Sequence, residues 1–260
     1  MNRRLFEQSE ISDGIAVFGG VRAEHVVKVL RGEPGQTLKT GEIDGAIGFS
    51  VIESIEGTSG GFTVRAKVSH DRESLKPWVD LVLAPPRPRV MKRLLPQLAA
   101  MGAGRIVLVG AKKVEKDFWG ATLLKEEIYR PLLIEGLMQS GTSVLPVVET
   151  RRNFRRFVKE ELDAAFPGAG RRIVAHPYEK TEKTGSVPKK TGSVPDSGRV
   201  LLAVGPEGGW SEDEVELLEA HGFERYSLGG RILRTDTALI ALLARLGMKE
   251  TPCLQTAHHR

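Results

Sequence analysis

Short apolar runs alternate with helical patterns after Lys76, and this alternation is the strongest constraint on the fold. The runs have the length and composition of buried strands, and they are Val79–Ala84, Ile106–Gly110, Val144–Val148, Arg172–Ala175, Leu201–Val204 and Tyr226–Leu228. Helical patterns separate and follow them, at Val90–Ala99, Trp119–Met138, Phe154–Ala165, Ser211–Ala220 and Ala238–Leu246. This order predicts an α/β fold with a mainly parallel, helix-covered sheet.

The N-terminal part of the chain has a different pattern. Residues Gly61–Ser69 alternate between apolar side chains on one face and Thr63, Arg65 and Lys67 on the other, as in a strand with one buried face. Glycine-rich breaks divide the region into short pieces, which predicts a compact barrel or sandwich, with a short helix at Glu24–Arg31. We therefore expect a β-rich domain over residues 1–74, a second domain over 75–250 and a tail over 251–260.

One segment of the second domain cannot contribute to a core. Residues Thr184–Ser197 contain the sequence TGSVP twice and are rich in Pro, Gly, Ser and Lys. We expect a mobile surface insertion, either without a function or gripping a substrate.

Composition limits the function classes. The formal charge of +5 fits a polyanionic partner without requiring one. The single Cys253 excludes a disulfide framework and a multi-cysteine metal site, and the sequence predicts a cytoplasmic protein with no metal and no membrane-spanning segment.

Two glycine-bearing turns predict a ligand pocket. The sequences VGPEGGWSEDE (Val204–Glu214) and LGGRILRTDTA (Leu228–Ala238) each follow an apolar run and precede a helical pattern. Ligands of parallel sheets bind at the carboxyl ends of strands, where such turns lie. The spacing matches neither the dinucleotide-binding nor the Walker phosphate motif, so we expect backbone groups and apolar contacts to hold the ligand. Either turn alone is also typical of an ordinary capped loop.

Together the two turns closely resemble the RsmE family of SPOUT methyltransferases. Two further stretches agree, EHVVKVLRGEPGQTL (Glu24–Leu38) and EGLMQSGTSVLPVVE (Glu135–Glu149), and the resemblance covers about residues 15–247. The chain departs from the family pattern at Thr142, where Arg is usual, and at Met138 and Asp236, where Glu is usual.

The resemblance implies a fold, an activity and partners. The fold is a SPOUT-type parallel-sheet domain with a C-terminal trefoil knot, preceded by a small PUA-like β-barrel that contacts RNA. The activity is transfer of a methyl group from S-adenosylmethionine to N3 of one uridine in 16S ribosomal RNA of the small ribosomal subunit, by a homodimer. Two alternatives stay open: a SPOUT ribose 2′-O-methyltransferase, and a non-catalytic RNA-binding ribosome-assembly factor.

The resemblance also implies site residues. Three loops would hold the cofactor through Ala175, His176, Pro177, Val204, Gly205, Pro206, Glu207, Gly208, Gly209, Leu228, Gly229, Ile232, Leu233, Arg234, Thr235, Thr237 and Ala238. Catalysis would involve Arg234 and Arg231 as cations near the substrate, with Glu207, His176 or water as general base. Expected RNA contacts are Arg22, Arg31, Arg65, Lys67, Arg87 and Arg89, the last two because they follow the end of a predicted strand. The basic segment Arg151–Lys159 is an RNA surface or a solvated helix face.

Overall fold

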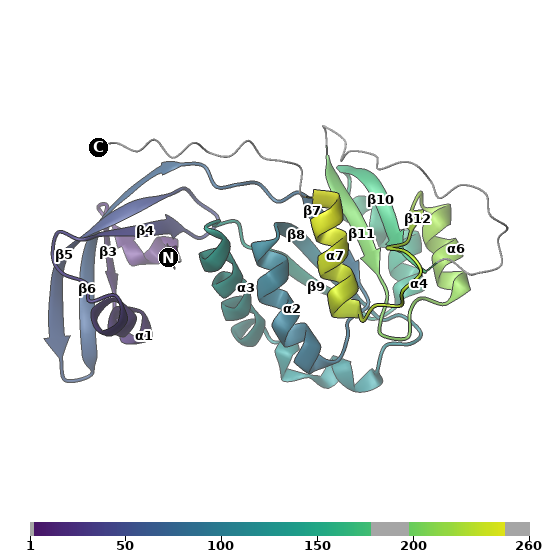
Figure 1. The fold of residues 1–260 in the computed structure, drawn as a ribbon, viewed down its shortest axis with the longest axis horizontal. Helices are drawn as coiled ribbons and strands as arrows, with labels where there is room; N and C mark the ends of the chain where they lie inside the picture. Colours follow the sequence, from purple (N-terminus) through teal and green to yellow (C-terminus); the bar gives the residue numbers. More distant parts are fainter. Residues whose placement is uncertain (1–2, 178–197, 248–260) are drawn as a thin grey trace. The chain divides into compact units, whose positions relative to one another are not determined.

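The computed structural model describes residues 3–177 and 198–247, and these fall into two compact units (Figure 1). The first unit comprises residues 1–76, 95–102 and 126–146, and the second comprises 77–94, 103–125 and 147–260. The predicted boundary after residue 74 stays a prediction. The TGSVP repeat, Cys253 and the tail over 251–260 lie outside the described residues.

The first unit contains a mixed six-stranded sheet. Its strands lie in the order β1 (Arg4–Phe6), β4 (Thr37–Glu42), β5 (Ile47–Thr58), β6 (Gly61–Arg72), β3 (Ile15–Phe18) and β2 (Ile11–Ser12). The pair β1–β4 is parallel and the other pairs are antiparallel. The predicted alternation in β6 is confirmed, because Val64 and Ala66 are fully buried while Arg65 and Lys67 are exposed.

The predicted helix near residue 24 is present but begins earlier. It starts as α1 (Gly20–Glu24) and continues as a π-helical turn, η2 (His25–Val29), burying Ala23 and Val26 against the sheet. Arg31 lies in the left-handed region with φ 51°, so the helix ends before it.

His70 makes the stability of this unit dependent on pH. Its Nε2 lies 2.9 Å from Thr40 Oγ1, and partial burial, followed by the positive charge of Arg3, lowers the pKa of His70 below 6.5. The unfolded chain therefore binds more protons between the two pKa values, and stability is lost as pH falls from about 6.5 through the folded pKa. We expect the melting temperature of the wild type to fall more than that of His70→Gln between about pH 7 and pH 5. Equal falls in both proteins would contradict this assignment.

The second unit contains a six-stranded sheet in which every pair is parallel, as predicted. Its order is β12 (Glu224–Tyr226), β10 (Ala169–Ala175), β11 (Arg199–Val204), β7 (Val79–Leu83), β8 (Ala103–Val109) and β9 (Val147–Arg151). The central strand β7 is buried along its whole length, and β11 is buried from Val200 onward. Apolar runs that are buried on both faces are typical of parallel strands.

Helices pack against one face of this sheet. This face packs against α6 (Glu212–Ala220) and the helical segment Phe154–Ala165, which consists of α4 (Phe154–Arg156), the π-helical turn η5 (Phe157–Glu161) and α5 (Leu162–Ala165). The second unit also contains α7 (Thr235–Gly247) and the start of α2 (Pro88–Ala100), whereas α3 (Glu126–Ser140) belongs to the first unit.

Several predicted boundaries differ from those of the structure; the strands predicted from Ile106 and Arg172, for example, begin at Ala103 and Ala169. The helix expected from Trp119 begins at Glu126, because two 3-10 turns, η3 (Lys116–Gly120) and η4 (Thr122–Leu124), precede it and are separated by extended backbone. The strand expected from Val144 begins at Val147, directly after a proline that cannot donate to a ladder. The strand expected to reach Leu228 ends at Tyr226, and its last residues belong to the following loop.

Candidate ligand pocket

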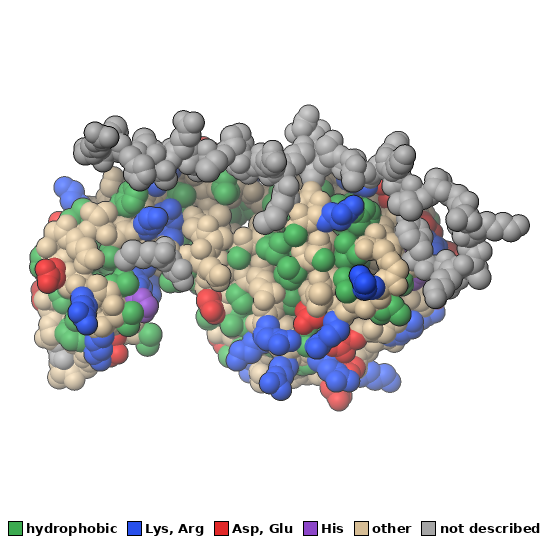
Figure 2. Space-filling model, in the orientation of Figure 1, with side chains coloured by type: hydrophobic (Ala, Val, Ile, Leu, Met, Phe, Trp, Pro, Cys, Tyr) green, Lys and Arg blue, Asp and Glu red, His purple; other side chains and the backbone are tan. Residues whose placement is uncertain are grey.

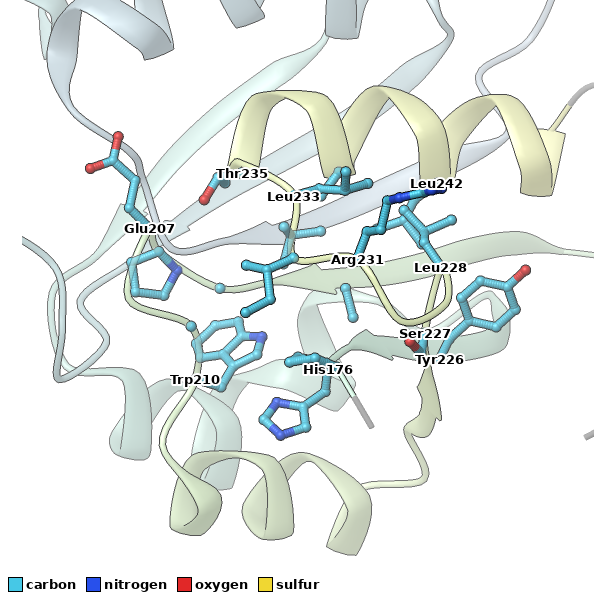
Figure 3. A pocket seen from close by; sticks show the side chains of 18 of the residues that line it. His176, Glu207, Trp210, Tyr226, Ser227, Leu228, Arg231, Leu233, Thr235 and Leu242 are labelled. Carbon is cyan, nitrogen blue, oxygen red and sulfur yellow. The ribbon is translucent and has the colours of Figure 1, made fainter. Parts of the chain in front are cut away.

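A pocket of about 280 Å³ lies where the strands β10, β11 and β12 end and where α7 begins (Figure 3). The structure brings these predicted cofactor residues together in its lining: Ala175, His176, Pro177, Val204, Gly205, Pro206, Glu207, Gly208, Gly209, Leu228, Gly229, Ile232, Leu233, Thr235 and Ala238. Arg231 also lines the pocket, whereas the predicted residues Arg234 and Thr237 do not.

The first glycine turn is tightly built. A Cβ atom on Gly205 would lie 2.9 Å from the backbone nitrogen of Trp210, so only glycine fits there without movement of the chain. The backbone N–H of Gly209 donates to the Pro206 carbonyl at 2.8 Å, and Gly209 has φ 69°. The Trp210 ring is buried and packs on Phe154 at a centroid distance of 5.1 Å.

Side chains from the loop after β8 brace this turn. Lys113 Nζ donates to the Gly208 carbonyl at 2.9 Å, and the backbone N–H of Lys112 donates to buried Glu214 at 2.8 Å. The second oxygen of Glu214 accepts the Ser211 backbone N–H, which completes the predicted capping box at the start of α6. Hydrogen bonds from Lys112 and then Ser211 lower the pKa of Asp213 to about 2, so this carboxylate stays charged beside the turn at neutral pH.

The second glycine turn joins β12 to α7 and is more exposed than the first. The backbone N–H of His176 donates to the Tyr226 carbonyl at 3.1 Å, which ties the end of β10 to the end of β12. Gly229 has φ 114°, a conformation that favours glycine. The four residues after Gly230 are exposed, and Ile232 is exposed by 94%.

The predicted catalytic residues lie at different places around the pocket. His176 lines it with a mostly buried side chain, whose Nε2 lies 3.9 Å from Glu212 Oε2. Glu207 lines the edge, with its carboxylate directed outward in Figure 3 and 3.5 Å from Arg87 Nε. Arg234 is outside the lining, with Nε 3.7 Å from Asp236 Oδ1.

Sequence reasoning missed four lining residues: Trp210, Tyr226, Ser227 and Leu242. Trp210 follows the Gly208–Gly209 pair directly, and its buried Nε1 has no hydrogen-bond acceptor among the described residues. Leu242 could have been found from helical periodicity, since Thr235, Ala238 and Leu242 share one face of α7.

The predicted RNA contacts also differ in their surroundings. The guanidinium of Arg22 pairs with Glu10, which raises the pKa of Arg22 and lowers that of Glu10. Arg87 donates to Glu115 at 2.9 Å, and this bond raises the pKa of Arg87. Arg31, Arg65, Lys67 and Arg89 are exposed.

Two of the positions that depart from the family pattern lie in the first unit. Thr142 Oγ1 lies 2.8 Å from Ser140 Oγ, and Met138 lines a second pocket beside Glu10 and Arg22. Within residues 3–177 and 198–247 there is no cluster of His, Cys, Asp and Glu with metal-binding geometry. The helices in the same ranges are too short or too polar to cross a membrane.

Comparisons with known proteins agree with the fold. Residues 73–247 match the model of a family described as an RNA methyltransferase domain. A solved ribosomal RNA small subunit methyltransferase E from Neisseria gonorrhoeae, bound to S-adenosyl methionine, is 22% identical and aligns with a TM-score of 0.69 over 94% of this chain and 95% of its own. That similarity shows that the two chains share a SPOUT-like methyltransferase fold.

Sequence relatives extend the match to nearly the whole chain. The ribosomal RNA small subunit methyltransferase E of Treponema pallidum is 32% identical over 94% of this chain and 90% of its own length. Ribosomal RNA small subunit methyltransferase E 1 of Borreliella burgdorferi is 26% identical over 93% of this chain and 95% of its own. Since the family model, the fold and these full-length relatives agree with the four motifs, the chain belongs to the ribosomal RNA small subunit methyltransferase E family, RsmE.

Proposed function

We propose that this protein transfers a methyl group from S-adenosylmethionine to N3 of one uridine in the 16S ribosomal RNA of the small ribosomal subunit. The observation that carries the proposal is the convergence of both glycine turns on one pocket, within the segment that matches the RNA methyltransferase domain. The names of the relatives in Treponema pallidum and Borreliella burgdorferi, and the cofactor named for the Neisseria gonorrhoeae structure, support it.

The residues present fit the proposed cofactor. The lining combines apolar side chains, such as Leu228 and Leu242, with the backbone groups of two glycine turns, and small-molecule sites usually have this composition. When bound, S-adenosylmethionine supplies a methyl group that is already activated, so the chain itself has to position the substrate and manage charge.

The chemistry assigns tasks to this chain's own residues. The N3 proton of uridine is weakly acidic and has to leave for the methyl group to be transferred. As the proton leaves, negative charge develops on O2 and O4, and this charge is neutralised when the methyl carbon bonds to N3. Arg231, which lines the pocket, and Arg234, one residue before α7, would offset that charge. Glu207, His176 or a water molecule would accept the proton. Because N3 lies on the pairing edge, the target base has to be unpaired or flipped out of its stack.

We further propose that the first unit is a PUA-like barrel that contacts RNA and that the second unit carries a C-terminal trefoil knot. Support comes from the mixed sheet, whose strand β6 exposes Arg65 and Lys67, and from the fold shared with the solved relative from Neisseria gonorrhoeae. A cytoplasmic homodimer completes this proposal, and sedimentation of the purified protein tests the dimer.

Methylation at N3 predicts a specific block to reverse transcription. It removes the pairing edge of uridine, whereas ribose 2′-O-methylation leaves that edge intact. We expect reverse transcriptase to stop or misincorporate at one uridine after incubation of small-subunit RNA with enzyme and cofactor, even at ample nucleotide concentration. The same RNA incubated without cofactor is the control.

Nucleoside mass spectrometry decides between the alternatives. A methylated ribose would replace the first proposal with the SPOUT 2′-O-methyltransferase. A protein that binds RNA but no S-adenosylmethionine would instead be the non-catalytic assembly factor.

A further inference from the structure

A carboxylate at the start of α7 holds two guanidinium groups beside the pocket. Asp236 Oδ2 lies 3.3 Å from Arg93 Nη2, and Asp236 Oδ1 lies 3.7 Å from Arg234 Nε. Asp236 follows Thr235, which lines the pocket, so this group borders the pocket without entering it. Arg93 comes from α2, 143 positions before Asp236 in the sequence.

The group has more positive than negative charge. Arg93 and Arg234 share one carboxylate, which leaves a net charge of +1, and their side chains are 62% and 71% exposed. On another part of the pocket edge the charges balance, because Arg87 lies between Glu115 and Glu207 and Lys113 Nζ binds the neighbouring Gly208 carbonyl. A polyanion that reaches the pocket is therefore favoured on the Arg93 side.

The surface around Arg93 extends this positive side. Arg89, Lys92 and Arg93 are exposed on α2, whereas Val90, Met91 and Leu94 between and after them are buried. Figure 2 shows Lys and Arg side chains gathered at the lower edge of the second unit, where α2 and α7 begin in the view of Figure 1. A planar guanidinium with donors left over after one ion pair suits bidentate binding of a phosphate.

We infer that Arg93 binds a backbone phosphate of the RNA next to the target nucleotide, while Arg234, held by the same carboxylate, faces the base. This inference rests on the proposed function. Phosphate contacts set the register of a nucleic acid on a protein, so Arg93 would fix where the target base lies relative to the pocket. Asp236 would act as a positioning residue, because it fixes the spacing of the two cations.

The test compares two neighbouring charges on one helix. Arg93→Gln and Lys92→Gln each remove one exposed positive charge from α2, but Lys92 has no ion pair with Asp236. Binding of a fluorescein-labelled single-stranded RNA, a uridine 12-mer, would be measured by anisotropy over a range of potassium chloride concentrations with the full chain. Loss of one phosphate contact should reduce the slope of log affinity against log salt by about 0.7.

We expect Arg93→Gln to show that reduced slope and about tenfold weaker binding at low salt, the scale of one charge-assisted hydrogen bond. Lys92→Gln should reduce the slope by less, because Lys92 is exposed but is not held beside the pocket by Asp236. Cofactor affinity should be unchanged in both variants, since neither residue lines the pocket. If the two variants have equal slopes while the wild type still binds RNA, the inference about Arg93 is wrong and the proposed function stands. If the wild type binds neither RNA nor cofactor, the proposed function is wrong, and the inference about Arg93 fails with it.

Discussion

Replacing Gly208 with valine is expected to abolish binding of S-adenosylmethionine while leaving the protein folded. Gly208 lines the pocket, so a β-branched side chain would occupy ligand space. In the free protein, a Cβ atom at this position would meet only the side chain of Lys113, at 3.0 Å from its Cδ, and that flexible side chain can move. The loss should therefore appear in binding and hardly at all in stability.

Titration calorimetry with S-adenosylhomocysteine and thermal melting measure the two effects separately. Gly120→Val is a matched control, because Gly120 does not line the pocket and nothing lies within 4 Å of its Cβ position. We expect one binding site per chain in the wild type and in the control. Wild-type affinity in Gly208→Val would show that the ligand lies elsewhere.

Arg234→Ala is expected to lower methyl transfer to RNA by roughly 10²-fold or more, the scale of losing one preorganised donor to a developing negative charge. Cofactor affinity should change little, since Arg234 does not line the pocket and its side chain is 71% exposed. Single-turnover transfer of a labelled methyl group at saturating RNA measures the effect, with Lys92→Ala as the control for loss of one positive charge. If Arg234→Ala turns over at the wild-type rate, or fails only because it no longer binds cofactor, the role assigned to Arg234 is wrong.

Much of the second unit could be predicted from the sequence. A parallel sheet requires strands that are apolar on both faces, and the run Val79–Ala84 shows this pattern directly. The two glycine turns were predicted to meet because the carboxyl ends of parallel strands share one edge, and the pocket lies there. Glycine, proline and capping residues act on the backbone close to them in the sequence. The turns and helix starts that they mark can therefore be predicted without knowledge of the tertiary structure.

Side-chain direction and distant ion pairs could not be predicted. Arg234 is one residue before a helix, and it pairs with Asp236 without lining the pocket. Glu207 is within the predicted motif, but Arg87, 120 positions earlier in the sequence, lies 3.5 Å from its carboxylate. Such ion pairs cannot be predicted from spacing along the chain, because they depend on which loops the fold brings together.

The two walls of the pocket differ in the conformational entropy that they lose when a ligand binds, because only the first glycine turn is braced. Lys113 and Glu214 hold the turn at Gly205–Trp210 by hydrogen bonds that form during folding, so this wall loses little conformational entropy when a ligand arrives. The opposite wall, at Arg231–Leu233, is exposed and lacks comparable hydrogen bonds among the described residues, so it would lose more conformational entropy on binding. Stiffening that second wall alone should slow ligand dissociation, whereas further stiffening of the first should change it little.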